Sequence, residues 1–306
     1  MARKLLIAAD VDRILIDRAL ADARFDVTLH PVKSEAELAA IVGECEILVT
    51  RAYNRVTADV IDRAPNLRLL AQGTSGTDNI DAYRAAERGI RIISLPGENA
   101  NAVAELVIGF MIVMTRTLPQ YTREVVSATW QRDDCSTRHE LRHHRLGIIG
   151  LGQVGRRVAR MARAFEIPVS AFDPYLTDDE FHHREANRFA SLEELIAGSD
   201  IVTLHVPLNP ETRGMMSEAR IRAMLPGSYL INAARGEVLD QTAALSALAS
   251  RHLAGLALDV YDPEPPAGGF PDDPRLVLTP HVAGCTYEAK ASIGAKLWDR
   301  ISNAYP

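Results

Sequence analysis

The sequence predicts an α/β protein with two parallel-sheet domains. The chain has 306 residues, and because domains cluster at about 100 to 200 residues, this length suits two cores. Short apolar runs alternate with helix-like segments along the whole chain, which is typical of parallel sheets with crossover helices. The runs form two series, and one long apolar segment separates them.

The first series of strands lies before the long apolar segment. The expected strands are, in order, "KLLIAA", "VTLH", "EILVT", "LRLLAQ" and "IRIISL". The stretches between them include "SEAELAAIV" and "TADVIDRA", which are helix-like. Because helices alternate with the strands, we expect these strands to be parallel.

The long apolar segment reads "NANAVAELVIGFMIVMTRTL" and begins at Asn99. It is too hydrophobic for a helix with one wet face, so we expect a buried helix, packed in part against a second subunit. Its longest uninterrupted apolar stretch, Leu106 to Met114, is shorter than the ~20 residues that a membrane-spanning helix needs. The sequence therefore predicts no membrane span.

The second series follows this helix. The expected strands are "LGIIG", "VSAFD", "IVTLHV", "SYLINA", "AGLALDV" and "LVLTP", and the expected helices are "GRRVARMARAF", "SLEELIAG" and "TAALSALAS". The proline-rich stretch from Tyr261 to Pro274 separates two of these strands and is expected to be a loop, because proline supplies no amide donor. Loops of this kind often carry functional residues.

Charge and cysteine content exclude several classes of function. A net charge of −6 provides no basic field for a nucleic acid backbone. The apolar run Leu5 to Ala9 is shorter than the ~7 to 15 residues of the apolar core of a signal peptide. Cys45, Cys135 and Cys285 are odd in number and far apart, unlike a disulfide framework or a thiolate metal site. These observations predict a cytoplasmic protein with no nucleic acid partner.

A glycine motif opens the second series. Gly150, Gly152 and Gly155 follow the strand "LGIIG" in G-x-G-x-x-G order and precede an amphipathic helix. The first glycine permits the tight turn, the second lets a pyrophosphate approach the backbone, and the third allows close packing of the helix, whose N-terminus is positive. The motif predicts a Rossmann-like dinucleotide-binding domain.

The residue that ends the next strand indicates the cofactor. Asp173 ends "VSAFD", where a carboxylate accepts hydrogen bonds from the adenosine ribose hydroxyls and repels a 2′-phosphate. NAD is therefore expected rather than NADP. Arg156 and Arg157 lie close by and are expected to flank the helix start; the alternative, that they admit NADP, is left open.

The stretch "HELRH" from His139 to His143 matches H-E-x-x-H, a zinc motif of metallohydrolases. That chemistry requires a helix, yet the stretch runs almost directly into the strand of the glycine motif. No third ligand follows, since Glu166 belongs to the nucleotide-binding helix. We expect a polar surface turn and no catalytic metal, although His139, His143 and His144 could bind zinc or nickel adventitiously.

Three charged residues lie at or near strand ends in the second series: Arg235, Glu264 and His281. Ligands of open parallel sheets bind beyond the carboxyl ends of the strands, so we expect the three to converge. Reduction of a 2-oxo acid needs a cation to hold the carboxylate and an acid to protonate the alkoxide, besides a hydride donor. Arg235 and His281 are suited to the first two roles, and Glu264 could orient and charge the imidazole.

The chain resembles the D-isomer-specific 2-hydroxyacid dehydrogenase family, close to its phosphoglycerate dehydrogenase and glyoxylate/hydroxypyruvate reductase branches. The resemblance covers nearly the whole chain and rests on motifs in the family's order. These motifs are "TDNID", "VAELVIG", "GLGQVG", "DIVTLHVPLNPETRGMM", "INAARG", "ALDVYDPEPP" and "TPHVAG".

The resemblance implies two Rossmann-like/flavodoxin-like parallel-sheet domains with the active cleft between them. Residues 1–98 and 287–306 would form the substrate domain, which the C-terminal helix completes. Residues 99–286 would form the NAD-binding domain. The helix that begins near Asn101 would make a homodimer. The implied activity is NAD-dependent interconversion of a small 2-oxo acid and its D-2-hydroxy acid.

The resemblance also implies roles for individual residues. Arg235 would bind the substrate, Glu264 would assist His281, and His281 would transfer the proton. Asp259 would hold the nicotinamide carboxamide. The residues expected to bind the cofactor are Gly150, Gly152, Gln153, Val154, Gly155, Asp173, His205, Val206, Pro207, Thr212, Ala233, Asp259 and Gly284. The residues expected to bind the substrate are Arg51, Ser75, Gly76, Arg235 and His281.

One departure from the family, and one arginine with two interpretations, leave the substrate open. Thr74 stands where the family commonly has a glycine, so the loop "GTSGTDN" is expected to differ in shape. Arg51 stands where phosphoglycerate dehydrogenases often bind the distal phosphate, and it could equally be a surface arginine after a strand. The alternative function is an NAD-sensing binding protein, because the family includes a corepressor lineage that keeps the three charged residues.

Overall fold

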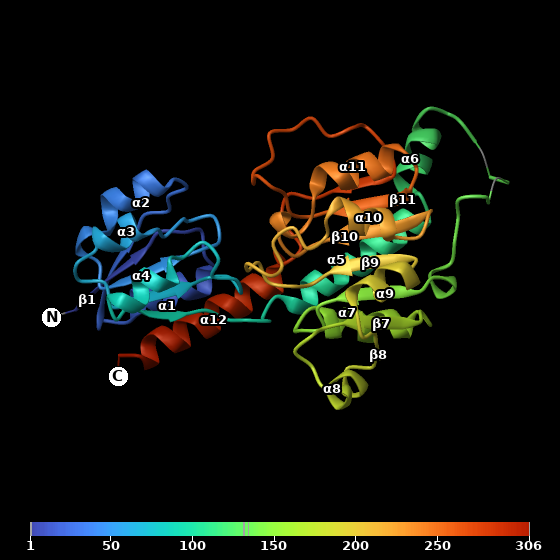
Figure 1. The fold of residues 1–306 in the computed structure, drawn as a ribbon. Coiled ribbons are helices and arrows are strands. Elements are labelled where there is room, and N and C mark those ends of the chain that lie inside the picture. Colours follow the sequence, from blue (N-terminus) through green and yellow to red (C-terminus); the bar gives the residue numbers. More distant parts are fainter. Residues whose placement is uncertain (1, 131, 134, 306) are drawn as a thin grey trace. The chain divides into compact units, whose positions relative to one another are not determined.

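The computed structural model describes residues 2–130, 132–133 and 135–305 of an α/β protein (Figure 1). Met1 and Pro306, the outer bounds of the predicted domains, lie outside the described residues. The chain divides into two compact units. Unit 1 comprises Met1–Asn99 and Cys285–Pro306, and unit 2 comprises Ala100–Gly284. Each unit contains one parallel sheet, which confirms the predicted fold class.

Unit 1 is built on a five-stranded parallel sheet in the order β2-β1-β3-β4-β5. This is the flavodoxin-like order 2-1-3-4-5. Its elements are β1 (Arg3–Ile7), α1 (Arg13–Ala21), β2 (Phe25–Leu29), α2 (Glu35–Ile41), η1 (Val42–Glu44), β3 (Ile47–Thr50), α3 (Ala58–Asp62), β4 (Leu69–Gln72), α4 (Ala82–Glu87), β5 (Arg91–Ile93) and α12 (Tyr287–Asn303).

Both faces of this sheet are covered. The central strands β3 and β4 are buried along their whole length, which explains why they lack alternating polar residues. The C-terminal helix α12 packs against α1, as Figure 1 shows, and Trp298 meets the ring of Phe25 edge-on at 5.2 Å between centroids. The last helix therefore completes the core of unit 1.

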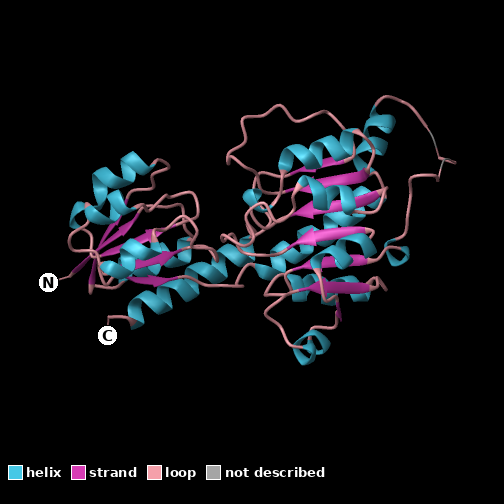
Figure 2. Ribbon diagram, in the orientation of Figure 1, coloured by secondary structure: helices cyan, strands magenta, loops and turns pink. Residues whose placement is uncertain are grey.

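Unit 2 is built on a seven-stranded parallel sheet in the order β12-β11-β10-β9-β6-β7-β8, with helices on both faces (Figure 2). Its elements are α5 (Ala100–Thr115), α6 (Leu118–Val126), η2 (Leu141–His143), β6 (Leu146–Ile149), α7 (Gly155–Ala164), β7 (Val169–Phe172), α8 (Asp178–His183), β8 (Asn187–Arg188), α9 (Leu192–Gly198), β9 (Ile201–Leu204), α10 (Glu218–Ala223), β10 (Ser228–Asn232), η3 (Gly236–Val238), α11 (Gln241–Ala249), β11 (Leu253–Leu258) and β12 (Leu276–Leu278).

The strand order of unit 2 is that of a Rossmann fold extended by a seventh strand. The first strand, β6, pairs with β7 on one side and with β9 on the other. The order therefore reverses at β6, and such a switch point is where open α/β sheets bind ligands.

The long apolar helix predicted from Asn99 onward is α5. Residues such as Val107, Phe110 and Met111 are buried in the core of unit 2, where α5 packs on α7 and β11. Its burial within unit 2 confirms the expected buried helix. No single described helix has the length and apolar character needed to cross a membrane, and α5 and α6 meet that criterion only as a pair bent by 58°.

Candidate active site

The glycine motif forms a tight turn between β6 and α7. Gly150 has a φ of +88°, and a Cβ built there would lie 2.7 Å from the carbonyl oxygen of His205. A Cβ at Gly155 would lie 2.1 Å from the carbonyl oxygen of Gly150. A Cβ at Gly152 would meet nothing within 4 Å. Two glycines are therefore needed by the turn itself, and the third faces open space at the N-terminus of α7, as a bound pyrophosphate requires.

Asp173 follows β7 and faces this turn. One carboxylate oxygen accepts a hydrogen bond from the amide of Leu151 at 3.0 Å, and the other accepts one from the amide of Tyr175 at 3.1 Å. Each oxygen has two lone pairs, so the carboxylate keeps acceptor capacity for ribose hydroxyls. Together with the open side at Gly152, this arrangement fits a dinucleotide.

The two arginines after the motif contact the glycine loop. Arg156 donates to the side chain of Gln153 at 2.5 Å, and Arg157 donates to the Gln153 carbonyl at 2.6 Å. Both guanidinium groups therefore flank the start of α7.

The loop after β9 contains the other residues expected at the cofactor. His205 is hydrogen-bonded through Nε2 to Thr203 at 2.9 Å, and burial lowers its pKa to about 3. Thr212 donates to the carbonyl of Pro207 at 2.6 Å and so closes the turn that directly follows Val206. His205 is thus a neutral imidazole at the switch point of the sheet.

Arg235, Glu264 and His281 come together in unit 2. They follow β10, β11 and β12, which are adjacent strands at one edge of the sheet. His281 Nδ1 lies 2.5 Å from Glu264 Oε1. Arg235 is close enough for its charge to act on Glu264. Glu264 and His281 therefore meet beyond the carboxyl ends of β11 and β12, and Arg235 follows the adjacent strand β10.

Opposing effects act on the Glu264 carboxyl. Burial acts to raise its pKa, while the hydrogen bond and charge of His281, a backbone hydrogen bond at Tyr261 and the charge of Arg235 act to lower it. The net result is a pKa below the usual value of a glutamate. Glu264 is therefore ionised at neutral pH and offers an acceptor to Nδ1 of His281.

His281 lies in an unusual backbone conformation that Asp259 stabilises. The φ of His281 is 53°, in the left-handed region that few residues other than glycine adopt. The buried carboxylate of Asp259 accepts hydrogen bonds from the amides of Val282 and Ala283 at 2.8 and 3.0 Å and from the hydroxyl of Thr279 at 2.6 Å. These contacts fix the loop that contains His281.

Two positioning residues were missed in the sequence. Asn232 accepts from the amide of Ala234 at 3.0 Å and donates to the carbonyl of Arg235 at 2.9 Å, so it shapes the turn that contains Arg235. Thr279 anchors Asp259, as described above. The sequence feature that could have revealed both residues is a polar residue at the end of an otherwise apolar strand, in "SYLINA" and "LVLTP".

The expected substrate residues of unit 1 follow the adjacent strands β3 and β4. Arg51 donates to the carbonyl of Asp10 at 3.1 Å, and its other terminal nitrogen lies 3.8 Å from the sulfur of Cys285. The hydroxyl of Ser75 donates to Asn99 at 2.6 Å. The carbonyl of Gly76 accepts from Gln72 at 3.1 Å. The carboxyl ends of these two strands thus place Arg51, Ser75 and Gly76 at one edge of the sheet.

Thr74 belongs to a hydrogen-bond network around the buried Gln72. The side-chain nitrogen of Gln72 donates to Thr74 at 3.0 Å and to Asn79 at 2.8 Å, while its oxygen accepts from Thr50 at 2.7 Å. Thr74 is not among the residues with positive φ. The threonine therefore fits this loop without a left-handed backbone.

The remaining cofactor residues occupy loop positions in unit 2. Ala233 follows β10, and Gly284 is the last residue of the unit. Alanine and glycine offer a cofactor only their backbone groups or a methyl group. Their positions after β10 and β12 are at the carboxyl ends of the strands that carry Arg235 and His281.

The segment "HELRHH" is not an α-helix. Leu141–His143 forms a single 3-10 turn, and His144 packs edge-on against Tyr229. The rings of His139 and His144 are 5.7 Å apart between centroids. Within residues 2–130, 132–133 and 135–305, no group of three or more histidine, cysteine, aspartate or glutamate side chains is arranged to hold a metal. The segment therefore lacks the α-helix that would place the two histidines of the zinc motif on one face.

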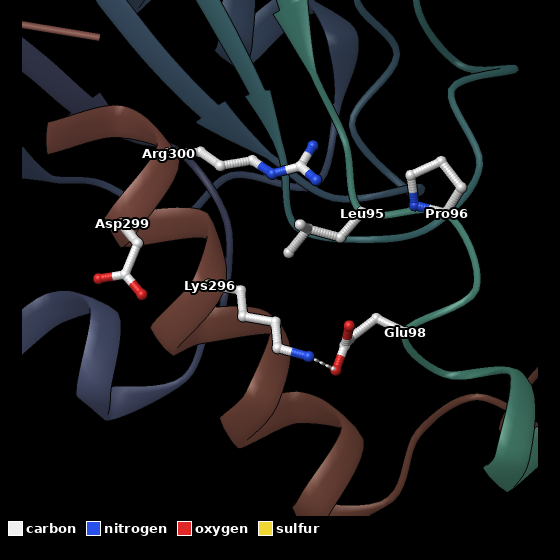
Figure 3. Close-up of a pocket in the computed structure, with 6 residues that line it drawn as sticks. All are labelled: Leu95, Pro96, Glu98, Lys296, Asp299 and Arg300. Atoms are coloured by element: carbon white, nitrogen blue, oxygen red, sulfur yellow. Dashed lines mark hydrogen bonds and ion pairs between the residues drawn. The ribbon is translucent and has the colours of Figure 1, made fainter. Parts of the chain in front are cut away.

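A hollow of about 350 Å³ lies in unit 1 beside α12 (Figure 3). Lys296 points toward Glu98 and donates to it at 2.6 Å, and Arg300 donates to the carbonyl of Ser94 at 2.9 Å. Asp299 pairs with Arg18 at 2.6 Å. None of the expected site residues lines this hollow, and its charges are paired within unit 1.

Comparisons with known proteins agree with this geometry. A sequence model described as "D-isomer specific 2-hydroxyacid dehydrogenase, NAD binding domain" matches residues 108–283. A D-3-phosphoglycerate dehydrogenase from Archaeoglobus fulgidus is 35% identical over 98% of this chain and 57% of its own length. A hydroxypyruvate reductase from Thermotoga maritima is 33% identical over 87% of this chain and 86% of its own length.

Solved structures agree as well. The crystal structure of D-lactate dehydrogenase from Aquifex aeolicus, complexed with NAD and lactic acid, superposes with a TM-score of 0.87 at 26% identity. The alignment covers 99% of this chain and 95% of that one. The chain spans about half the length of the curated phosphoglycerate dehydrogenases that it matches first.

Proposed function

Because the chain belongs to the D-isomer specific 2-hydroxyacid dehydrogenase family, we propose that it is an NAD-dependent oxidoreductase acting on a small 2-oxo acid and the matching D-2-hydroxy acid. The observation that carries the proposal is the 2.5 Å contact between His281 and Glu264, beside Arg235, in the unit that holds the glycine turn. The relatives described above are named as dehydrogenases or a reductase, which favours an enzyme over an NAD-sensing binding protein.

The cofactor site is assigned to unit 2. The amides around Gly152 and the N-terminus of α7 would hold the pyrophosphate, and Asp173 would accept from the ribose hydroxyls. The loops after β9, β10 and β11 would supply the remaining contacts. When bound, NADH supplies the hydride that reduces the carbonyl carbon.

His281 would supply the proton in the reduction. Its Nδ1 is engaged by Glu264, so the transferred proton is the one on Nε2. The ionised Glu264 orients the imidazole, so that Nε2 can give this proton to the carbonyl oxygen as negative charge develops there. In the oxidation, the neutral imidazole would accept the hydroxyl proton at the same atom.

Arg235 would orient the substrate. A guanidinium binds a carboxylate through two parallel hydrogen bonds and so fixes the plane of a 2-oxo acid. Its positive charge also stabilises the negative charge that develops on the carbonyl oxygen. Asn232 holds the turn that presents this side chain.

We propose that residues 1–98 and 287–306, which lie within unit 1, form the substrate domain, and that residues 99–286 form the NAD-binding domain; these bounds differ from those of the two units by one or two residues at each junction. Arg51 and the backbone at Ser75 and Gly76 support the assignment, because they follow adjacent strands of the unit 1 sheet. The Gln72 network supports it further, since it ties the loop of Thr74 to the carboxyl end of β3.

The proposed function is tested by NADH oxidation against glyoxylate, hydroxypyruvate, phosphohydroxypyruvate, pyruvate and longer 2-oxo acids. We expect steady turnover on at least one of them. If phosphohydroxypyruvate is preferred, Arg51→Ala is expected to raise its KM by about tenfold or more, because one charged hydrogen bond to the phosphate is lost. NADH binding without turnover on any acid of the panel would contradict the dehydrogenase and favour the NAD-sensing protein.

We also propose a homodimer formed through α5 and the residues that follow it. The apolar side chains of Val125, Val126 and Trp130 are 61%, 84% and 78% exposed and lie close together in the sequence, at the end of α6 and just after it. Val125 and Trp130 line a hollow of about 300 Å³ that Leu118 also lines. A second copy of the chain would bury this surface.

The dimer is tested by measuring the molar mass of the protein with light scattering as it elutes from a size-exclusion column. We expect twice the chain mass of 33.5 kDa. Val126→Glu is expected to shift the mass toward one chain, because a charge would be buried in the interface. Tyr83→Glu is the matched control, since Tyr83 is 78% exposed in unit 1. A single-chain mass for the unmodified protein would contradict the proposal.

A cytoplasmic location completes the proposal. No disulfide joins Cys45, Cys135 and Cys285, and burial raises the pKa of the Cys45 thiol to about 12. Thiols of this kind are kept in a reducing compartment. Fractionation of the source cells would test it, and recovery outside the cytoplasm would contradict it.

A further inference from the structure

A hydrogen bond links the loops on either side of the glycine turn. The hydroxyl of Tyr175, after β7, donates to a carboxylate oxygen of Glu211, after β9, at 2.5 Å. The amide of Tyr175 donates to Asp173 at 3.1 Å. Because β7 and β9 both pair with β6, this link spans the strand that ends at the glycine turn. Asp173, Tyr175 and Glu211 thus form one continuous chain of contacts.

The link has a carboxylate at each end. The pKa of Tyr175 is raised by the hydrogen bond to Glu211, then by the charge of Glu211 and by burial, with a smaller effect from Asp173. Tyr175 is therefore protonated at neutral pH and acts as the donor. Glu211 is further held by its own amide, which donates to the side chain of Asn209 at 2.9 Å.

The basic side chains nearest in sequence each have a partner within unit 2. Arg156 and Arg157 donate to Gln153, and Arg213 lies 3.9 Å from Glu237. Arg184 donates to the carbonyl of Leu151 at 2.6 Å. The two loops that flank β6 therefore each contain a carboxylate, Asp173 after β7 and Glu211 after β9, and Tyr175 contacts both.

We propose that Glu211 is a second determinant of the selection of NAD over NADP, acting together with Asp173. The inference rests on the proposed function, since it concerns the adenosine end of the proposed cofactor site. A 2′-phosphate adds about two negative charges next to the ribose, and each nearby carboxylate repels it. Tyr175 acts as a positioning residue, because its hydroxyl ties the Glu211 carboxylate to the loop that contains Asp173.

The test measures dissociation constants of NADH and NADPH by fluorescence titration of the purified protein at low ionic strength. Glu211→Gln keeps an acceptor for the Tyr175 hydroxyl and removes only the charge. We expect NADPH to bind about three- to tenfold more tightly to this variant, while NADH binding stays within about twofold. Raising the salt concentration should reduce the effect of Glu211→Gln on NADPH binding. At 0.1 M, salt screens the interaction between exposed charges over a Debye length of about 10 Å.

Three further comparisons test the role of Glu211. Glu218→Gln is the matched control, since Glu218 begins α10 and pairs with Arg222, and it should change neither constant. Tyr175→Phe should relax the selection less than Glu211→Gln does. If the unmodified protein binds NADPH too weakly to measure, the same comparison is made in an Asp173→Asn background, where the remaining selection should fall when Glu211 is also replaced.

The outcomes separate the two proposals. Equal shifts for both nucleotides in Glu211→Gln, or no shift for NADPH, would overturn the role of Glu211 and leave the proposed function in place. Failure of the unmodified protein to bind NADH at all would overturn the proposed function itself, and with it the inference.

Discussion

Replacing His281 by alanine is expected to lower kcat for 2-oxo acid reduction by about 10²–10⁴-fold, the usual contribution of a positioned general acid. The imidazole is the proposed proton donor, and water would have to replace it without the fixed geometry that Glu264 and the Asp259-anchored loop provide. Steady-state rates with the preferred acid, measured at saturating NADH, check this result.

The binding of NADH should remain within about twofold in the same variant, because the proposed nucleotide contacts lie at the glycine turn and Asp173. His143→Ala is the matched control. Its side chain is 70% exposed in the turn after Glu140, and its removal should leave kcat unchanged. If His281→Ala retained kcat within a few-fold, another group would have to supply the proton.

Glu264→Gln separates orientation from charge in the same pair. Glutamine can still accept from Nδ1, but it no longer favours the charged imidazole. We therefore expect kcat to fall less in Glu264→Gln than in His281→Ala, as is typical of a residue that assists the proton donor. Equal losses in the two variants would mean that the pair acts as a single unit.

The charged residues of the site could be predicted because parallel sheets have a fixed polarity. Arg235, Glu264 and His281 each follow an apolar run, and strands that run in one direction bring such positions to one edge. The glycine turn was predictable for a similar reason, since its spacing has a steric meaning that the structure repeats at Gly150 and Gly155.

Contacts between loops could not be predicted in the same way. Tyr175 and Glu211 are 36 positions apart, and nothing in either segment indicates that β7 and β9 flank the same strand. Asp259 is a related case. The resemblance implied a role at the nicotinamide, while the structure shows a buried carboxylate that also holds the amides after His281.

Some local features could not be predicted because their segments are short or polar. The strand β8 has two exposed residues, Asn187 and Arg188, and no apolar periodicity to reveal it. The φ of 53° at His281 is also invisible in the sequence, because a histidine gives no sign of a left-handed backbone. Hydrogen bonds to Asp259, which is far from this loop in the sequence, stabilise that conformation.

The glycine turn allows stability and nucleotide binding to be separated by two single substitutions. In Gly155→Ala, the new Cβ would lie 2.1 Å from the carbonyl oxygen of Gly150, and that oxygen is backbone rather than the end of a flexible side chain. The turn must therefore shift. We expect a loss of about 1–3 kcal/mol in the free energy of unfolding, part of it offset by the better helix propensity of alanine. Urea titration followed by circular dichroism measures it.

Gly152→Ala is expected to do the opposite. Nothing lies within 4 Å of a Cβ at this position, so the free energy of unfolding should change by no more than about 0.5 kcal/mol. The methyl group would instead occupy the space through which a pyrophosphate approaches the backbone. The dissociation constant of NADH should then rise by about tenfold or more, since the charged hydrogen bonds at the start of α7 would lengthen. Unchanged NADH binding in Gly152→Ala, with stability intact, would show that the pyrophosphate does not approach this turn.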